Sequence, residues 1–514
     1  MIFRTGRVGV VGDQGTLSMR RRTGVNSGSW LTNVSSVLRR LPSTFFRSRR
    51  PESDLSRQFF PDAENGDGKL KLENGSRIGV IGSGPAGSFF SHFLLDMTRR
   101  LGIDVGLDIY DPRDFAVIGP TGCNMCGGII SESLVQMLAA EGINLPTTVV
   151  QRGIDSYMLH TDVGSVRIDT PLHEKRIAAI HRGTGPRDID AKDIKWFSFD
   201  RFLQDLAVDK GARLVRDRVD TISWQDGRPR IKTRRGLEQD YDLLAVAVGV
   251  NSPSLKLFQE MVPQYQAPQS TKTFICEYKL GPETLEKYMG DSMHVFLLNL
   301  PRLEFAAIIP KGEYATVCLL GEDIDKPLIK SFLESPLVRK CFPPEVPPEP
   351  PPCHCSPRIN TSGAVQPFGD RVVFIGDSGV TRLFKDGIGA AYRTAKAAAE
   401  TAVFTGVSRE DFQTHYWPKC RDIDFDNKIG KAIFALTRLW QKRPHDLRGI
   451  VRMVATEQAD RKRTPHMSMV LWDLFTGSAT YREILWRTLH PGFVSRLVWN
   501  VIVGHLDLRR SKLP

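Results

Sequence analysis

The apolar and polar positions of the chain follow three patterns, and each predicts a different kind of element. Short, unbroken apolar runs bounded by Asp and Gly predict the buried strands of a parallel sheet. These runs occupy 78–81, 103–110, 241–248 and 372–375. Apolar residues at helical spacing predict helices at 88–101, at 199–210 and from Gly387 through an Ala-rich stretch. Alternation of apolar and polar residues predicts an antiparallel sheet from 166–168, 273–280, 295–298, 305–309 and 315–320.

The strand and helix patterns alternate along the chain, which predicts the α/β fold class. We expect a Rossmann-like domain, an interleaved antiparallel-sheet substrate domain and a helical C-terminal region. The expected boundaries are 76–150, 196–255 and 353–405 for the discontinuous Rossmann-like domain, 151–195 and 256–342 for the substrate-binding subdomain, 343–352 for a proline-rich connector, and 406–514 for the helical region. Residues 1–75 lack an apolar period and are expected to form a disordered or targeting-like basic extension.

A glycine-rich motif follows the first predicted strand and precedes a predicted helix. Gly82 permits the sharp turn between them, and Gly87 lets the helix lie close to the strand. Gly84 has no side chain, so backbone N–H groups can approach a pyrophosphate at the helix N-terminus. Asp111 ends the next strand about 20 residues further on, where an acid binds ribose hydroxyls. The residues assigned to this dinucleotide site are Gly82, Gly84, Pro85, Ala86, Gly87 and Asp111.

A second motif, Gly376-Asp377-Ser378-Gly379, follows the strand at 372–375. The Asp377 carboxylate can accept hydrogen bonds from ribityl hydroxyls, and the helix that begins at Gly387-Ile388 would direct its dipole at the pyrimidine edge of a flavin. Gly249 ends the strand at 241–248, at the edge of the sheet where ligands bind. Two distant motifs that hold one long dinucleotide predict FAD as the cofactor and make the Rossmann-like domain an FAD-binding domain.

The charge of the chain is concentrated at its ends. The net charge is +12, and residues 1–50 hold ten Arg against the single acid Asp13. Basic ends with apolar neighbours favour peripheral contact with an anionic membrane over nucleic-acid binding, although a solvated tail would have the same composition. Trp472, Trp486 and Trp499 lie among arginines, which also suits a membrane interface. Charged residues interrupt every apolar stretch of this region, which disfavours a spanning helix.

The eight cysteines show no spacing typical of an extracellular disulfide framework. We therefore expect a cytoplasmic protein, peripheral to a membrane at most, or an organellar one if the N-terminal extension is a transit peptide. The sequence does not predict the oligomeric state.

Four motifs, taken in order, resemble the geranylgeranyl reductase family of flavoproteins over roughly residues 76–405. They are GSGPAG, Cys126-Gly127-Gly128-Ile129, Ile309-Pro310-Lys311-Gly312 and GDSG followed by KDGIGAAYRTAKAAAE. The resemblance implies a fold of the p-hydroxybenzoate hydroxylase type with a single nucleotide domain. It also implies an enzyme that reduces isolated double bonds of polyprenyl chains, with NAD(P)H or ferredoxin as the electron donor to FAD.

The resemblance assigns roles to further residues. Cys126 falls where the family places a cysteine beside the flavin and the substrate cavity, which makes it the candidate catalytic residue, and Gly127 and Gly128 would contact the cofactor. Phe305 and Ala307 fall where the family has a Tyr and a Trp that line a lipid channel, and Pro310 completes this substrate-binding motif. The family also has an Arg before its Phe-Asp pair, where this chain has Trp196-Phe197-Ser198. These departures predict a flavin environment and a lipophilic substrate that differ from those of the family.

The sequence thus predicts an FAD-dependent oxidoreductase that reduces carbon–carbon double bonds of an isoprenoid or other lipophilic substrate. A flavin monooxygenase that hydroxylates a lipophilic or aromatic substrate is one alternative, because the fold is shared. A thiol–disulfide flavoprotein using Cys123 and Cys126 is another, since Cys-x-x-Cys pairs suit redox cycling. A flavin-binding assembly partner without activity is a further alternative.

A zinc site is the last alternative that the sequence leaves open. Its ligands would come from Cys123, Cys126, Cys353, His354 and Cys355, which are of the right types but irregularly spaced.

Overall fold

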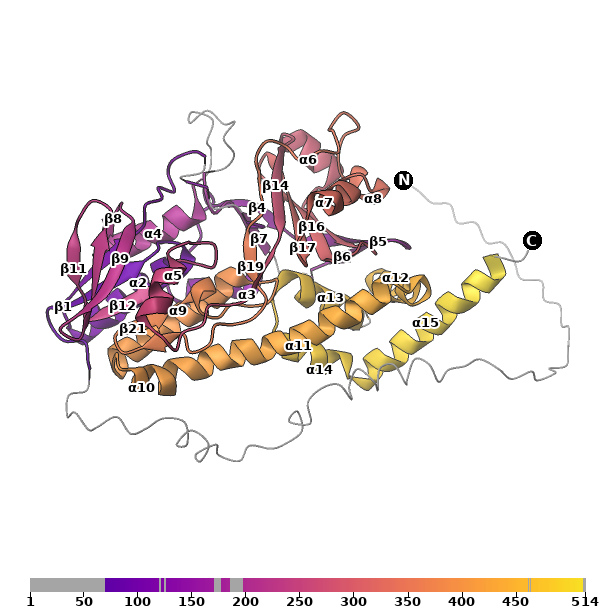
Figure 1. Cartoon of the computed structure of the whole chain (residues 1–514). Helices are drawn as coiled ribbons and strands as arrows, with labels where there is room; N and C mark the ends of the chain where they lie inside the picture. The colour runs from indigo at the N-terminus through magenta and orange to yellow at the C-terminus, as the bar shows by residue number, and fades with distance from the viewer. Residues whose placement is uncertain are drawn as a thin grey trace, which may run out of the picture. The chain divides into compact units, whose positions relative to one another are not determined.

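The computed structural model describes residues 70–119, 122–123, 126–170, 177–184, 197–460, 462 and 464–511, with side chains as far as Gly504. All of these belong to the compact unit Lys69–Pro514. Nearly all of the expected basic extension, residues 1–75, therefore lies outside the described residues. Figure 1 labels the elements discussed below.

A six-stranded sheet with the strand order β20-β21-β12-β1-β2-β8 forms the first half of the fold. Its strands are β1 (Ser76–Ile81), β2 (Val105–Tyr110), β8 (Arg213–Val215), β12 (Leu243–Val246), β20 (Phe368–Gly369) and β21 (Val372–Phe374). All neighbouring strands pair in parallel except β20 with β21. The carboxyl ends of β21, β12 and β1 therefore lie side by side, and segments distant in sequence meet at one edge of the sheet.

The apolar runs predicted as parallel strands are buried because helices cover the sheet. The helices are α2 (Pro85–Leu101), α4 (Phe199–Asp209) and α9 (Gly387–Phe404). α2 packs between the other two with Phe89, Phe90 and Phe93 buried in the main core. The aromatic rings of Phe89 and Phe93 meet the edge of Tyr392 from α9 at centroid distances of 5.7 and 5.4 Å. Two helices that are distant in sequence, α2 and α9, thus share one core.

A seven-stranded sheet of the order β18-β14-β17-β16-β15-β5-β6 forms the second half. Its strands are β5 (Ser156–Thr161), β6 (Gly164–Asp169), β14 (Phe274–Lys279), β15 (Ser292–Leu297), β16 (Leu303–Lys311), β17 (Tyr314–Gly321) and β18 (His354–Cys355). Only β5 and β15 pair in parallel. All nine residues of β16 are buried, so both faces of this sheet are covered at its centre.

The other strands form small sheets outside the two large ones. The remaining strands are β3 (Ile129–Ile130), β4 (Val150–Ile154), β7 (Ile177–Ile180), β9 (Val219–Gln225), β10 (Arg228–Thr233), β11 (Glu238–Asp240), β13 (Ser270–Lys272) and β19 (Arg358–Asn360). The helices between them are α3 (Glu132–Ala140), α5 (Leu255–Met261), α6 (Pro282–Tyr288), α7 (Lys326–Leu333) and α8 (Pro336–Arg339). Residues 343–352 contain neither helix nor strand.

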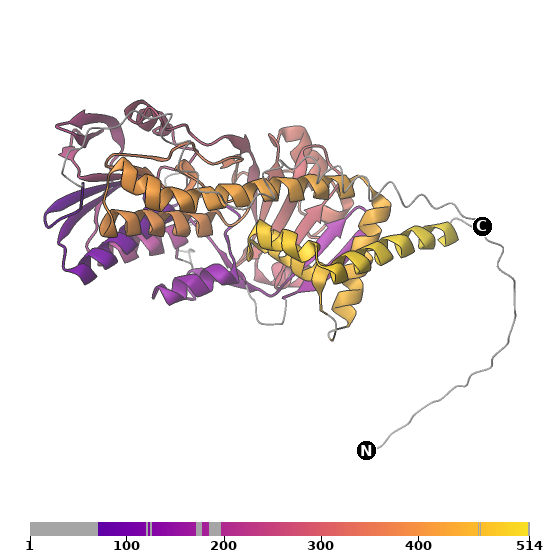
Figure 2. The ribbon, with the colours of Figure 1, turned by 90° about the horizontal axis from the view of Figure 1, so that it is seen from below.

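The C-terminal region is helical, as predicted. It comprises α10 (Arg409–Asp411), a π-helical turn (Phe412–Tyr416), α11 (Trp417–Gln441), α12 (Pro444–Ala459), α13 (His466–Thr476), α14 (Tyr481–Thr488) and α15 (Pro491–Ser511). Figure 2 shows α11 running from beside the first sheet to beside the second, in agreement with its contacts to α9 and β16. The structure confirms the predicted fold class of a Rossmann-like domain, an interleaved antiparallel-rich sheet and a helical C-terminal region.

The three tryptophans expected at a membrane interface have different surroundings. Trp472 is fully buried and stacks on Tyr157 at 5.6 Å, so its expected interfacial position is wrong. Trp486 and Trp499 are 67% and 66% exposed. Within the described residues, every helix is too short or too polar to cross a bilayer.

Candidate cofactor and substrate site

A cavity of about 370 Å³ lies where the carboxyl edge of the six-stranded sheet meets the seven-stranded sheet. Twelve of the predicted site residues line it: Gly84, Pro85, Ala86, Cys126, Gly127, Gly128, Gly249, Phe305, Ala307, Asp377, Gly387 and Ile388. Five others lie outside its lining: Gly82, Gly87, Asp111, Gly376 and Pro310. The structure therefore brings motifs from both halves of the chain to one cavity.

The glycine motif forms a strand–turn–helix in which the backbone at Gly84 is accessible from the cavity. Gly87 must be a glycine, because a Cβ there would lie 1.9 Å from the carbonyl oxygen of Gly82. By contrast, the space in front of Gly84 is open, and the nearest heavy atom to a Cβ there would be Nη2 of Arg182 at 3.8 Å. A ligand can therefore approach the backbone at Gly84 but not at Gly87.

Two helices begin at the cavity, and neither has a side-chain cap. α2 starts after Gly84 with Pro85 in its first turn, and α9 starts after Asp386. The first N–H groups of a helix have no partner within it and carry the positive end of the helix dipole. These two N-termini reach the cavity from segments about 300 residues apart, and both favour anionic or electron-rich groups.

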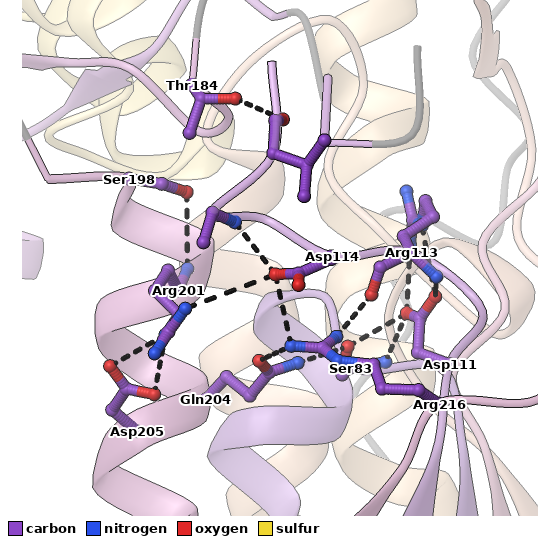
Figure 3. A network of polar contacts seen from close by, with 12 residues as sticks. Ser83, Asp111, Arg113, Asp114, Thr184, Ser198, Arg201, Gln204, Asp205 and Arg216 are labelled. Atoms are coloured by element: carbon purple, nitrogen blue, oxygen red, sulfur yellow. Dashed lines mark hydrogen bonds and ion pairs between the residues drawn. The ribbon is translucent and has the colours of Figure 1, made fainter. Parts of the chain in front are cut away.

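Asp111 is held inside the protein by a polar network (Figure 3). Its carboxylate accepts hydrogen bonds from the backbone N–H and the hydroxyl of Ser83, at 2.8 and 2.9 Å, and from the guanidinium of Arg113. Burial opposes ionisation of Asp111, but Arg113 and the N–H of Ser83 outweigh it and lower the pKa of the carboxyl. The Asp111 side chain thus fixes the turn after β1, and Arg113 lines the cavity in its place. Its assignment to ribose stays a prediction.

The same network ties the loop after β2 to α4. Gln204 donates to the Ser83 hydroxyl at 2.7 Å, and Arg216 donates to the Gln204 amide oxygen at 2.9 Å and to the carbonyl oxygen of Arg113. Arg201 lies within 4.0 Å of Asp114 in the same loop. Ser83, within the glycine motif, is therefore held by the loop after β2 and by α4.

An arginine that sequence reasoning missed also lines the cavity. Arg182 follows β7 and donates to both carboxylate oxygens of Asp200, at 2.9 and 2.8 Å. Burial on its own would lower the pKa of Arg182, but Asp200, Cys126 and Asp377 raise it, so the guanidinium stays charged. The Asp200 side chain is fully buried. The structure thus places a positive charge beside Asp200, from a residue two positions after β7.

The sequence offers a weak signal for Arg113 and none for Arg182. Arg113 stands two residues after the predicted ribose acid, close enough to be considered with it. Arg182 lies 18 positions before Asp200 in the chain, with no motif that links them, so only the tertiary structure joins the two.

The Cys-Gly-Gly loop and the Pro-Lys-Gly turn, predicted separately, are in contact. Lys311 is buried and donates to the carbonyl oxygen of Cys126 at 3.2 Å. Gly128 has φ = +63°, and a Cβ there would lie 2.0 Å from the carbonyl oxygen of Ile180. Its N–H lies 3.1 Å from the Cys126 sulfur. Lys311 therefore acts by holding the loop that presents Cys126 to the cavity.

A buried carboxylate balances the charge of Lys311. Glu277 on β14 lies 3.8 Å from Lys311 and 3.5 Å from His181, and accepts a hydrogen bond from Thr316 at 2.8 Å. Burial raises the pKa of Glu277, but His181, Lys311 and Thr316 together lower it to about 2. The negative charge of Glu277 is therefore compensated by Lys311 inside the seven-stranded sheet.

The wall provided by the seven-stranded sheet is apolar. Phe305 and Ala307 project from β16 into the cavity, with Ile309 of the same strand beside them. Phe305 packs against Phe434 of α11 at 5.9 Å and Phe475 of α13 at 5.4 Å. Because Phe475 and Thr476 also line the cavity, the C-terminal helices close it on this side. At least part of the helical region is therefore a cap on the body of the protein.

One cation faces this apolar wall. Lys385, just before α9, places its ammonium group 4.3 Å from the ring centroid of Phe305 and 5.1 Å from that of Phe475, and donates to the carbonyl oxygen of Phe475. Burial lowers the pKa of Lys385 to about 7, because the aromatic surroundings replace water around the charged form. A lysine with this pKa can give up or accept a proton near neutral pH.

Asp377 stands between the two halves of the cavity. It belongs to a short 3₁₀ turn (Gly376–Ser378) after β21, and its carbonyl oxygen accepts a hydrogen bond from Asn360 at 2.8 Å. Burial raises the pKa of the carboxyl, with Arg182 acting in the opposite direction. A carboxyl group desolvated in this way is suited to ligand hydroxyls, which can donate hydrogen bonds to it.

The alternative zinc site does not assemble. Among the described residues, the one group of three or more His, Cys, Asp or Glu side chains with metal-binding proximity is His160, His294 and Cys341. None of the five residues of the predicted zinc site belongs to it. Cys123 and Cys126 are both partly exposed.

No family model and no curated protein matches this chain in sequence. Solved structures do match its fold. A geranylgeranyl bacteriochlorophyll reductase-like protein from Thermoplasma acidophilum matches 81% of this chain and 99% of its own, with a TM-score of 0.56 and 15% identity. A flavoprotein/dehydrogenase from Cytophaga hutchinsonii matches 84% and 100%, with a TM-score of 0.53 and 15% identity.

A variant of the halogenase PltM in complex with FAD is also similar in structure, with a TM-score of 0.53, 13% identity and coverage of 86% of this chain and 93% of its own. These matches extend over both sheets, and the identities are too low to carry an activity. The chain therefore has the fold shared by geranylgeranyl reductase-like flavoproteins and FAD-dependent halogenases.

Proposed function

We propose that this protein is an FAD-dependent oxidoreductase that reduces carbon–carbon double bonds of an isoprenoid or other lipophilic substrate. The observation that carries the proposal is the convergence of two uncapped helix N-termini, Arg182 and Asp377 on one cavity whose far wall is apolar. When bound, FAD would supply a hydride at the boundary between these two halves. The fold is shared with proteins described as reductase-like, as a dehydrogenase and as a halogenase, one of them in complex with FAD.

The polar half of the cavity fits a dinucleotide. The open backbone at Gly84, the N-terminus of α2 and the Arg182 guanidinium would hold the pyrophosphate, since all three favour negative charge. Asp377 would accept hydrogen bonds from ribityl hydroxyls, and the N-terminus of α9 at Gly387 and Ile388 would approach the pyrimidine edge. The adenosine end would extend toward Arg113.

The apolar half fits a hydrocarbon substrate. Phe305 and Ala307 offer no hydrogen-bonding groups, so a lipophilic chain that binds against them leaves water without breaking hydrogen bonds of the protein. Reduction of a double bond also needs a proton, and Lys385 is placed to donate it from the aromatic wall. Cys126 lies on the opposite loop, where its thiol would pack against the substrate. NAD(P)H or ferredoxin would reduce the flavin.

A lipophilic substrate resides in a membrane, and one surface of the C-terminal helices suits contact with it. Five apolar residues of α14, α15 and the turn between them are all at least 38% exposed: Trp486, Leu489, Val494, Trp499 and Ile502. Arg487 and Arg496 lie among them in sequence. Exposed tryptophans with neighbouring cations are typical of the headgroup region of a bilayer. We therefore include peripheral binding to an anionic membrane in the proposal.

The decisive experiment combines spectroscopy with product analysis. The purified chain should be yellow or bind added FAD, and NADPH, NADH or reduced ferredoxin should bleach the flavin anaerobically. Geranylgeraniol, used as an isoprenoid probe, should then restore the colour and leave a product heavier by two hydrogens. Incorporation of labelled oxygen in air would instead establish hydroxylation. Protein that stays colourless with added FAD would refute both.

Membrane contact is tested separately by flotation with vesicles of anionic and neutral phospholipids. Binding to the anionic vesicles alone, reduced at least about tenfold by Trp486→Ala with Trp499→Ala, is expected. Trp224→Ala, at a tryptophan of β9 that is 44% exposed, serves as the control away from the C-terminal helices.

A further inference from the structure

Three metal-binding side chains meet on the face of the seven-stranded sheet that points away from the cavity. They are His160 of β5, His294 of β15 and Cys341, which lies two residues after α8. Nε2 of His160 lies 2.9 Å from Nδ1 of His294, and the Cys341 sulfur lies 3.2 Å from the same Nδ1. All three side chains are buried, with residue exposures of 7%, 7% and 2%.

The register of the sheet explains why the two histidines meet. β5 and β15 are parallel, and His160 pairs with Phe296. His294 lies two residues before Phe296, so its side chain points to the same face. Met293, one residue earlier, lines the cavity on the opposite face. The cluster is thus separated from the proposed flavin site by the thickness of one sheet.

We propose that His160, His294 and Cys341 form a binding site for a divalent transition metal ion, with Zn²⁺ as the preferred ion. Imidazole nitrogen and thiolate sulfur are the ligands that zinc favours over calcium or magnesium. Bonds of about 2.1 Å to nitrogen and 2.3 Å to sulfur require ligand atoms roughly 3.4 Å apart. The two histidine nitrogens, 2.9 Å apart, would need to separate by about 0.5 Å, and all three ligand atoms already lie within 4.8 Å of one another.

The surroundings of the histidines favour ligation. Nδ1 of His160 is 2.8 Å from the hydroxyl of Ser165 on β6, and donation to that hydroxyl leaves Nε2 with its lone pair toward the cluster. Metal-ligating histidines commonly make such a second hydrogen bond, which fixes their ring orientation. The ring of Phe296 stacks on His160 at 4.6 Å and limits its rotation further.

Three protein ligands leave a fourth position of a tetrahedral ion for water or another small ligand. The ion would join two strands to the segment that follows α8. On this face of the sheet, Phe296 of β15 already packs against Phe332 of α7. The site would therefore fasten the helical cover of the sheet to its central strands and rigidify the wall that bears Phe305 on its other face.

The test uses the full chain after removal of metal by a chelator. Titration with Zn²⁺ against a chromophoric competitor should give about one equivalent per chain. Titration with Co²⁺ should produce a thiolate-to-metal charge-transfer band together with the intense visible absorption of a four-coordinate ion. Cys341→Ser should abolish the charge-transfer band and weaken Zn²⁺ binding at least about 100-fold.

Cys276→Ser is the matched control, because Cys276 is fully buried within the same sheet and packs in the same core cluster as Cys341. Its metal binding should equal that of the unaltered chain. A second measurement avoids reliance on a variant that fails to fold: bound Zn²⁺ should slow alkylation of Cys341 in the unaltered protein, read by mass spectrometry of its peptide. The proposal is overturned by less than about 0.1 equivalent of bound Zn²⁺, by unchanged binding in folded Cys341→Ser, or by loss of binding in Cys123→Ser instead.

Discussion

The two halves of the cavity are built in different ways. The half at the six-stranded sheet is made largely of backbone: a glycine turn, two helix N-termini and a loop after a strand, backed by the hydrogen bonds of Asp111 and Asp200. The half at the seven-stranded sheet is made of side chains, with Phe305, Phe475 and Lys385 from three distant segments. In the first half, an added side chain would collide with neighbouring backbone, so few substitutions are tolerated. In the second half, substitution of side chains can alter which substrate fits.

The largest effect is expected where backbone approaches backbone. Gly87→Ala places a Cβ 1.9 Å from the carbonyl oxygen of Gly82, and neither backbone segment can retreat. We expect a loss of unfolding free energy of about 3 kcal/mol or more, with little soluble, flavin-bound protein. Urea denaturation measures it. Gly106→Ala, in the next strand with nothing within 4 Å of the added carbon, should stay within about 0.5 kcal/mol of the unaltered chain.

The second effect concerns the buried ion pair of the polar half. Arg182→Met leaves the Asp200 carboxylate buried without its cation, which costs about 3–5 kcal/mol of stability. Adding Asp200→Leu removes that penalty and should restore most of the stability. If Arg182 also contacts the cofactor, the double variant will still bind FAD at least about tenfold more weakly, measured by fluorescence titration. Full recovery of FAD affinity would reduce Arg182 to a structural role.

The third effect concerns Lys385, the charged side chain beside the apolar wall of the cavity. With its pKa lowered to about 7, Lys385 is protonated below that pH and progressively loses its proton above it. If it donates the proton, the rate of substrate reduction is level below pH 7 and falls tenfold per pH unit well above it. Lys385→Met should slow this step by about 10²–10⁴-fold and abolish the pH dependence. Stopped-flow reoxidation of the flavin by substrate measures it, and flavin reduction by the electron donor is the internal control.

The smallest effect is expected from filling the apolar wall. Ala307→Trp adds a large side chain at a cavity-lining position of β16. It should raise KM for a long isoprenoid by about tenfold or more while FAD affinity stays unchanged, since the dinucleotide half is untouched. If Ala307→Trp weakened FAD binding as much as it raised KM, the polar and apolar halves of the cavity would not be independent.

The elements of the polar half were largely predictable because each one is encoded locally. An apolar run, a glycine turn and a helix occur within about 30 residues of sequence, and the same holds for the strand and turn that contain Asp377. Asp111 shows the limit of this reasoning: the motif placed an acid at the end of β2, but its engagement with Ser83 and Arg113 depends on how the loop after the strand folds back.

The apolar half was predictable only as a list of strands. The alternation of β16 indicates which residues share a face, but not what lies opposite. Phe475 comes from a helix 170 residues later, and nothing near it in sequence indicates a cavity. Trp472 was expected at a surface and is instead packed on Tyr157, because α13 turns its apolar side to the sheet.

The sequence by itself determined the α/β class, the pair of motifs at Gly82–Gly87 and Gly376–Gly379, and the order of the strands along the chain, since periodicity and turn chemistry act over a few residues. The tertiary structure alone decided that Arg182 faces Asp200, that Lys311 supports the Cys126 loop, and that His160, His294 and Cys341 converge. Such contacts depend on strand register and on which faces pack together, and these are set by the free energy of the whole core rather than by any local pattern.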